Sequence, residues 1–251
     1  MKNSASSPQP SGSAERKWFA RLRNARFTHL LIALSLLLFL SPLVGTFGYL
    51  LGQTVSVVLV VTALAVVLLA AALAVSDNAR QTRVSLILAG VCVALTLLAQ
   101  LFESPTMRIG QQILTIGFLT HVVQMIIRSL FRQHSVDYDT IAASLCGYLL
   151  IGVVFAVVYS LAMEINVSAI SNTQADQTSK IALRFGDRHT VTSLYFSFVT
   201  LTTLGYGDIT PVSTTARMLT TAEALIGQLY LVVLVARLVG LHISNEMASR
   251  R

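Results

Sequence analysis

The feature that most constrains this chain is a long stretch without charge near its start. From Phe27 to Ser76 it contains no Asp, Glu, Lys or Arg. A membrane-spanning helix needs roughly 20 apolar residues, so this stretch is too long for one span and long enough for two. A proline and several glycines between 42 and 52 interrupt it. They predict a tight turn between helices at about 27–48 and 53–75.

Four more apolar stretches follow, separated by polar residues. The expected spans lie at 84–101, 109–127, 140–163 and 214–243, and a short amphipathic segment at 191–202 precedes the last one. Hydrophobic residues make up 54% of the chain and charged residues only 12%, about half the roughly 25% of soluble domains. This composition argues against a disordered chain and a soluble enzyme. The expected fold is an all-α transmembrane protein with six spanning helices.

Basic residues before the first span indicate the orientation. Segment 1–26 is polar and holds a cluster formed by Arg16, Lys17, Arg21, Arg23 and Arg26. Positive charge favours the cytoplasmic side, so we expect both ends of a six-span chain to be cytoplasmic, although Arg108 and the cations of 164–190 weaken this bias. The expected location is the cell membrane, specifically a bacterial inner membrane. The net charge of +7 comes from residues in short stretches between the apolar runs. Membrane topology explains these charges better than nucleic-acid binding does, so no nucleic-acid partner is expected.

One motif carries most of the functional information. Residues 200–208 read T-L-T-T-L-G-Y-G-D, which resembles the potassium-channel signature T-x-T-T-x-G-Y-G-D, with Leu204 where Val or Ile is commoner. The motif lies between the amphipathic segment and the last span, which resembles the channel plan of helix, re-entrant loop and helix. The resemblance covers 140–243, the expected pore domain. It implies a potassium-selective channel that assembles as a homotetramer in membrane lipid, because each chain supplies one filter segment.

The physics of potassium binding explains these residue types. Backbone carbonyls of Thr203, Leu204, Gly205 and Tyr206, repeated in four chains, would replace the water shell of a K+ ion, as in known potassium-channel filters. The Thr203 hydroxyl would add an inner ring of oxygens. Gly205 and Gly207 permit the unusual dihedrals that aim successive carbonyls the same way. Leu204 and Tyr206 would then point away from the pore and pack behind it. Apart from K+ as the permeant ligand, no cofactor is expected.

Residues next to the filter are expected to support it. Asp208 would concentrate cations at the outer mouth, or it is a solvated turn residue. Tyr195 and Phe196 resemble the paired aromatics that brace the filter in this family, or they are interfacial aromatics. Thr202 is also expected to support the filter. Glu223 is an ionisable residue inside a span. It would hydrogen-bond the pore helix, or it would act as a protonated, pH-sensitive element.

The last span carries a hinge candidate and a gate candidate. Gly227 lies where the inner-helix hinge of this family usually sits relative to Gly207, although a close helix-packing contact explains a small residue equally well. Leu231, Val235 and Val239 recur at helical spacing. They would line the cavity as a hydrophobic gate, or face the fifth span.

The first four spans, 27–130, resemble a voltage sensor only in number. A sensor needs several charges in its fourth span, because one elementary charge across 100 mV contributes only about 2.3 kcal/mol. The fourth span has Arg108 at one end and Arg128 at the other, with no charge between them. We therefore predict weak or no intrinsic voltage dependence. The segment after the last span, 244–251, is expected to be a short cytoplasmic tail without a ligand-binding domain.

Two other functions remain open at this level. A non-selective cation channel would use the same scaffold, but such channels usually alter Tyr206 or Gly207. A membrane regulatory subunit that no longer conducts is the other alternative. An enzyme is not expected, since no nucleophile, base and orienting residue form a recognisable pattern.

Overall fold

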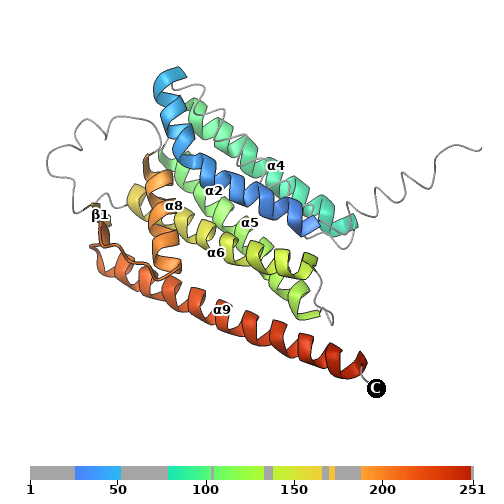
Figure 1. Cartoon of the computed structure of the whole chain (residues 1–251). Helices are drawn as coiled ribbons and strands as arrows, with labels where there is room; N and C mark the ends of the chain where they lie inside the picture. Colours follow the sequence, from blue (N-terminus) through green and yellow to red (C-terminus); the bar gives the residue numbers. More distant parts are fainter. Residues whose placement is uncertain are drawn as a thin grey trace, which may run out of the picture.

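The computed structural model describes residues 26–51, 79–102, 105–132, 138–165, 170–172 and 188–249. The expected second span, 53–75, and nearly all of segment 1–26 lie outside the described residues. The described helices are α2 (Arg26–Leu51), α4 (Ala79–Phe102), α5 (Pro105–Arg132), α6 (Tyr138–Ile165), α8 (Arg188–Leu201) and α9 (Thr214–Ser249), and the described strands are β1 (Ile170–Asn172) and β2 (Ile209–Pro211) (Figure 1).

Three described helical segments are long and apolar enough to cross a membrane. They cover 106–132, 138–165 and 214–241. The first two contain the expected fourth and fifth spans, and the third covers all but the last two residues of the expected sixth span. The apolar parts of α2 and α4 are shorter in the described residues, at 27–39 and 83–98. The largely helical membrane fold is therefore confirmed, while the total of six spans stays a prediction.

Local sequence explains where several helices begin. Pro105 is the first residue of α5, a position where its missing N–H costs no helical hydrogen bond. Ser213 accepts a hydrogen bond from the backbone N of Ala216 at 3.1 Å, which caps the start of α9. Asp139 lies in the first turn of α6 and accepts a hydrogen bond from the backbone N of Phe27 at 3.3 Å. This carboxylate therefore joins the starts of α6 and α2.

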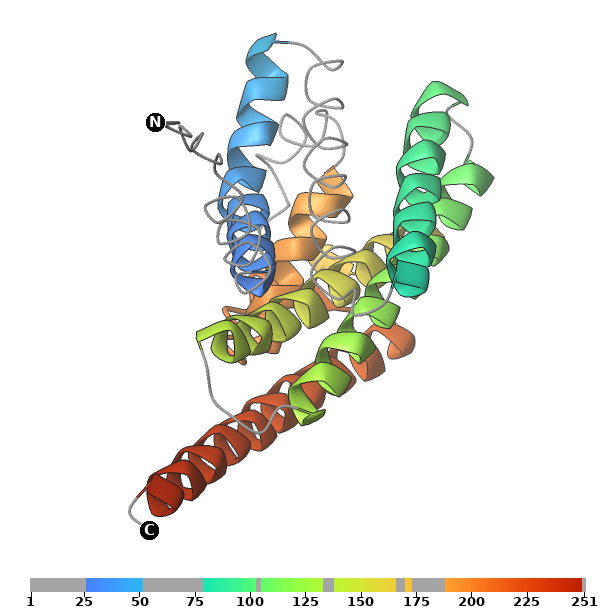
Figure 2. The same cartoon turned by 90° about the vertical axis from the view of Figure 1, so that its right-hand side faces the viewer.

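Helix α6 is the centre of the molecule. It packs against α2, α5, α8 and α9. Helix α9 runs beside α6 (Figure 1), and α5 crosses α6 so that the C-terminal end of α5 reaches α9 (Figure 2). The core combines residues of five helices, among them Leu30, Leu34, Cys92, Phe118, Leu119, Ile126, Cys146, Leu150 and Leu201. Cys92 and Cys146 are buried free thiols. Helices α6 and α8 thus share one apolar core with α2, α4 and α5.

The structure adds features that the sequence did not predict. Strand β1 pairs antiparallel with β2, with Ile170 opposite Pro211 and Asn172 opposite Ile209. Both segments were expected to be loops, because a three-residue strand has no local pattern and depends on its distant partner. The predicted pore helix, 191–202, begins earlier at Arg188, and the predicted tail is helical as far as Ser249.

Candidate functional site

The loop after α8 has left-handed backbone at every second residue. The φ angles are +57° at Thr203, +56° at Gly205 and +80° at Gly207. Glycine adopts such angles without a steric penalty. Thr203 is β-branched, and this conformation costs an ordinary L-residue roughly 1–2 kcal/mol. The surrounding structure must hold Thr203 in place, and sequence reasoning had foreseen only the two glycines.

Hydrogen bonds fold this loop back onto the end of α8. The Val199 carbonyl accepts hydrogen bonds from the backbone N atoms of Leu204, at 2.9 Å, and Gly205, at 3.3 Å. Tyr148 of α6 donates its hydroxyl to the Leu201 carbonyl at 3.2 Å. These bonds satisfy carbonyls that the last turn of a helix leaves without intrahelical partners. The loop is therefore attached to both α8 and α6.

The two threonine hydroxyls at the base of the loop donate to nearby backbone. Thr202 Oγ1 lies 2.6 Å from the Phe198 carbonyl, and Thr203 Oγ1 lies 2.7 Å from the Thr202 carbonyl. A hydroxyl that donates its proton keeps lone pairs on its oxygen. The Thr203 oxygen can therefore act as a cation ligand, while Thr202 ties the loop to α8.

At the other end of the loop, an aromatic residue of α8 holds the acidic residue. Tyr195 donates its hydroxyl to Asp208 Oδ2 at 2.8 Å, and this hydrogen bond raises the pKa of the Tyr195 phenol. The second oxygen, Oδ1, is buried and has no hydrogen-bond partner among the described residues. Strand β2 begins at the next residue, Ile209, and its pairing with β1 anchors the chain as it leaves the loop.

A buried polar group lies behind α8. Glu223 is fully buried on α9 and accepts a hydrogen bond from the Tyr159 hydroxyl of α6 at 2.6 Å. Ser197 Oγ of α8 lies 2.5 Å from Glu223 Oε1 and 2.7 Å from the Gly152 carbonyl of α6. Phe196 is also buried, and its ring meets the Tyr159 ring edge-on with centroids 4.9 Å apart. Three helices therefore meet at one carboxyl group.

Gly227 lies where α9 approaches the end of α8 most closely. A Cβ atom there would come within 2.8 Å of both the Leu201 carbonyl oxygen and the Leu201 side chain. Helix α9 continues through this position without a break. Close packing therefore accounts for the glycine in this structure, and the hinge stays a prediction.

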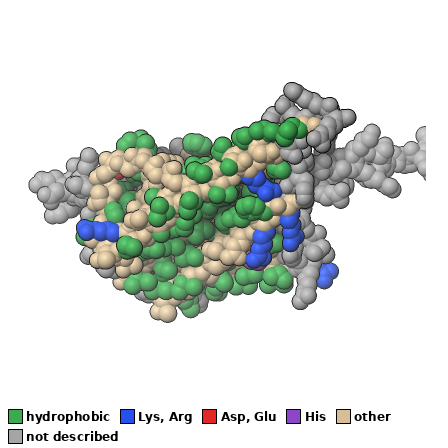
Figure 3. Space-filling view, turned by 90° about the horizontal axis from the view of Figure 1, so that it is seen from below, with side chains coloured by type: hydrophobic (Ala, Val, Ile, Leu, Met, Phe, Trp, Pro, Cys, Tyr) green, Lys and Arg blue, Asp and Glu red, His purple; other side chains and the backbone are tan. Residues whose placement is uncertain are grey.

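The loop and much of α9 are uncovered within a single chain. Leu204 is 55% exposed and Tyr206 is 66% exposed, so neither packs behind the loop on its own chain. Val235 and Val239 of α9 are also exposed, and Leu231 is partly buried. Seen from the side of α9, hydrophobic side chains spread over this face, and Lys and Arg side chains gather towards its ends (Figure 3).

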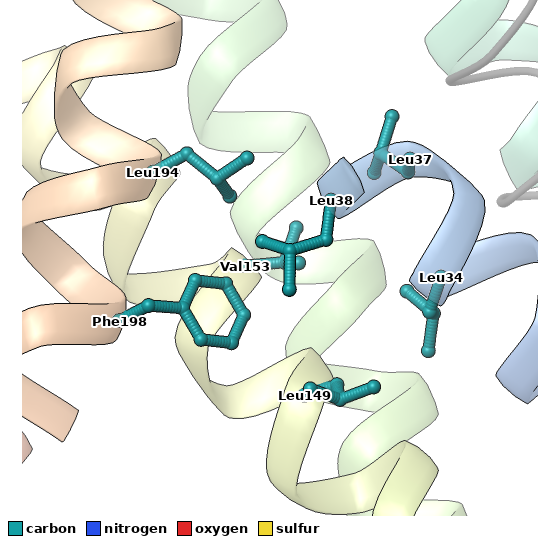
Figure 4. Close-up of a pocket in the computed structure, with 7 residues that line it drawn as sticks. All are labelled: Leu34, Leu37, Leu38, Leu149, Val153, Leu194 and Phe198. Carbon is teal, nitrogen blue, oxygen red and sulfur yellow. The ribbon is translucent and has the colours of Figure 1, made fainter. Parts of the chain in front are cut away.

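The N-terminal helices α2 and α5 contact the helices next to the loop at two separate places. Leu34 and Leu38 of α2 share a small apolar pocket with Val153 of α6 and Phe198 of α8 (Figure 4), so α2 packs against both α6 and α8. On α5, Gln112 donates to Ser160 of α6 at 3.2 Å. Both contacts place N-terminal helices next to the elements that hold the loop.

A second connection lies at the other end of α5. Arg237 of α9 donates to the Leu130 carbonyl, and its guanidinium lies 4.9 Å from the centre of the Phe131 ring. That carbonyl belongs to the last turn of α5, where helix carbonyls lack intrahelical partners and attract cations. Arg237 therefore links the inner half of α9 to α5.

Sequence reasoning missed several residues of this site. Tyr148, Tyr159 and Ser197 were not singled out, although polar side chains inside apolar spans are a usable signal. Their partners lie 53, 64 and 26 residues away in the chain, which periodicity cannot reveal. Among the described residues, no group of three or more His, Cys, Asp or Glu side chains is placed to hold a metal ion.

Comparison with known proteins points to this same region. A family model described as "Ion channel" matches residues 144–242, from α6 into α9. Protein LctB of Bacillus caldotenax is 32% identical to the chain over 106 residues, which are 42% of this chain and 75% of that protein. No solved structure matches the chain.

Proposed function

Because the chain belongs to the ion channel family, we propose that it is a potassium channel, a homotetramer that conducts K+ passively through a central pore. The observation that carries this proposal is the left-handed backbone at Thr203, Gly205 and Gly207 within the T-x-T-T-x-G-Y-G-D sequence. Carbonyls of 203–206 from four chains stack into oxygen rings, the arrangement known from potassium-channel filters. The Thr203 hydroxyl adds the innermost ring.

Four copies give the exposed surfaces a role. One chain supplies one loop, and a closed ring of identical chains is an ordinary assembly. In such a ring the side chains of Leu204 and Tyr206, exposed in one chain, pack behind the filter against a neighbouring copy. The uncovered face of α9 then turns towards the central axis and the adjacent copy. Leu231, Val235 and Val239 line the inner cavity, and Gly227 is available as a hinge.

Other parts of the proposal concern the membrane and gating. The channel lies in the cell membrane with both termini cytoplasmic, and needs no cofactor besides its permeant ion. Asp208 concentrates cations at the outer mouth. Between Arg108 and Arg128, α5 has no charged residue. Voltage therefore has little charge to act on, and intrinsic voltage dependence is weak or absent.

Current through the purified protein in planar bilayers tests this function. With unequal potassium and sodium concentrations on the two sides, we expect the current to reverse near the potassium equilibrium potential and the open probability to change little with voltage. Reversal near zero would favour a non-selective cation channel. A correctly folded tetramer that passes no current would favour the regulatory subunit.

One glycine pair gives a matched test of the filter. Gly205 has φ +56°, and nothing lies within 4 Å of where its Cβ would be, so Gly205→Ala changes backbone preference without a clash inside the chain. We expect it to abolish potassium selectivity or current. Gly117 of α5 also has open space, and no left-handed φ. Gly117→Ala should conduct like the wild type, and equal behaviour of the two variants would contradict the proposed filter.

A further inference from the structure

The hydrogen-bond group around Glu223 has more contacts than an ionised carboxylate can satisfy. Its three oxygen–oxygen contacts are Tyr159 Oη to Oε2 at 2.6 Å, Ser197 Oγ to Oε1 at 2.5 Å, and Ser197 Oγ to the Gly152 carbonyl at 2.7 Å. Each hydroxyl has one proton to donate, and a carbonyl only accepts. If the carboxylate is ionised, two protons serve three contacts. An acid at Oε1 supplies the third proton.

The surroundings also favour a neutral group. Glu223 has no exposed surface, and no described Lys or Arg forms an ion pair with it. A buried charge without a partner is costly, whereas a neutral group whose hydrogen bonds are all made is tolerated. In the acid form the order of donation is simple. Tyr159 donates to Oε2, the acid O–H at Oε1 donates to Ser197, and Ser197 donates to the Gly152 carbonyl.

We propose that Glu223 is a positioning residue that works in its acid form, donating a hydrogen bond to Ser197 and thereby holding α9 against α8 and α6 behind the filter. This inference deepens the proposed potassium-channel function and rests on it. Ser197 lies on the helix whose Val199 carbonyl binds the loop. One turn after Glu223, Gly227 contacts the end of that helix. The acid therefore sets the position of α8 relative to α9, and with it the position of the loop.

Substitutions at Glu223 separate a hydrogen-bond role from a charge role. Glu223→Gln keeps a carbonyl that accepts from Tyr159 and supplies an N–H that donates to Ser197. We expect its selectivity and open probability to match the wild type. Glu223→Leu keeps the approximate size and removes every hydrogen bond. Its open probability should fall on the order of tenfold or more, because both hydrogen bonds to the carboxyl group are lost. A Glu223→Gln channel as impaired as Glu223→Leu would overturn the proposal, because charge would then be essential.

Infrared spectroscopy of the full chain in lipid nanodiscs at neutral pH tests the acid form directly. We expect a carboxylic-acid C=O band in the wild type that disappears in Glu223→Gln and shifts in Ser197→Ala. No such band, or a band that Ser197→Ala leaves unchanged, would overturn the proposal. This readout needs no current and does not depend on whether Glu223→Leu folds. A failure of the acid form is thus distinguishable from a failure of the potassium-channel function.

Discussion

Helices α6 and α9 are similar in apolar length and hydropathy, but they differ in how much of each helix is buried within the chain. Each contains a 28-residue apolar span, within which an 18-residue window has a mean hydropathy of 2.5 in α6 and 2.1 in α9. Inside the chain, 56% of the α6 window is buried, against 6% for α9. Buried positions of α6 occur on every side of the helix. The fully enclosed positions of α9 form one stripe, at Ala216, Glu223 and Gly227.

This difference shows that apolar character does not reveal what a helix packs against. Both helices satisfy their backbone hydrogen bonds internally, as any membrane helix must. Helix α6 meets α2, α5, α8 and α9 and serves as the internal scaffold. Helix α9 buries small or polar residues, and its Tyr230 and Arg237 also contact α6 and α5. Its large apolar side chains remain available for lipid or for the second copy that we propose.

The largest expected effect concerns the free face of α9. Leu225, Leu229 and Val232 are 58%, 62% and 64% exposed. A disulfide requires Cα atoms within about 7 Å of each other. If this face of α9 contacts a second copy, at least one single-cysteine variant at these three positions should form a crosslink between two copies on oxidation. The measurement is a covalent dimer on a denaturing gel.

Exposed positions of α6 are the control for this scan. Ile141→Cys and Leu145→Cys place thiols at residues that are 42% and 47% exposed on α6, which we do not assign to the contact between copies. We expect no dimer from them. Dimers from α6 and none from α9 would reverse the assignment of the two helices.

The next effect concerns the close approach of α9 to α8. Gly227→Ala places a methyl group against the Leu201 carbonyl, and such overpacking costs typically about 1–3 kcal/mol. We expect a lower melting temperature of the purified protein in detergent. Gly240→Ala on the same helix meets nothing within 4 Å and should not lower stability. An unchanged melting temperature with altered gating in Gly227→Ala would favour a hinge over a packing role.

A smaller effect is expected where α6 supports the loop. Tyr148→Phe removes the hydroxyl that donates to the Leu201 carbonyl, and one such hydrogen bond contributes about 0.5–1.5 kcal/mol. The open probability should fall by a few-fold while the conductance of open channels stays the same. If the open probability of this variant equals that of the wild type, the hydrogen bonds between the loop and the Val199 carbonyl of α8 are sufficient to hold the loop, and the bond from α6 is not needed.

The smallest effect is expected at the outer edge of α6. Arg108 of α5 pairs with Glu164 of α6 at 2.8 Å, and its side chain is 46% exposed. Exposed ion pairs contribute at most about 1 kcal/mol. Arg108→Gln should therefore change the melting temperature little and leave the current–voltage relation unchanged. A steep voltage dependence that this substitution abolishes would instead identify α5 as a sensor.

Much of the fold was predictable because it depends on local composition. The expected spans at 84–101, 109–127 and 140–163 lie inside α4, α5 and α6, since apolar length and helix formation are properties of short segments. Positive φ at Gly205 and Gly207 follows from glycine's own freedom. Thr203 could not be predicted in the same way, because its strained conformation depends on bonds made by its neighbours.

Local sequence was thus sufficient for the membrane class, for the helices at 84–101, 109–127 and 140–163, and for the position of the loop between α8 and α9. It left open what Glu223 contacts and whether Gly227 bends or packs. Three-dimensional packing resolved the first, placing the carboxyl group between Tyr159 and Ser197, and revealed a tight contact of Gly227 with Leu201. The physical reason is that hydrogen bonds and close contacts are short-ranged. They depend on which distant segments of the chain meet. A pattern of apolar residues does not show which segments those are.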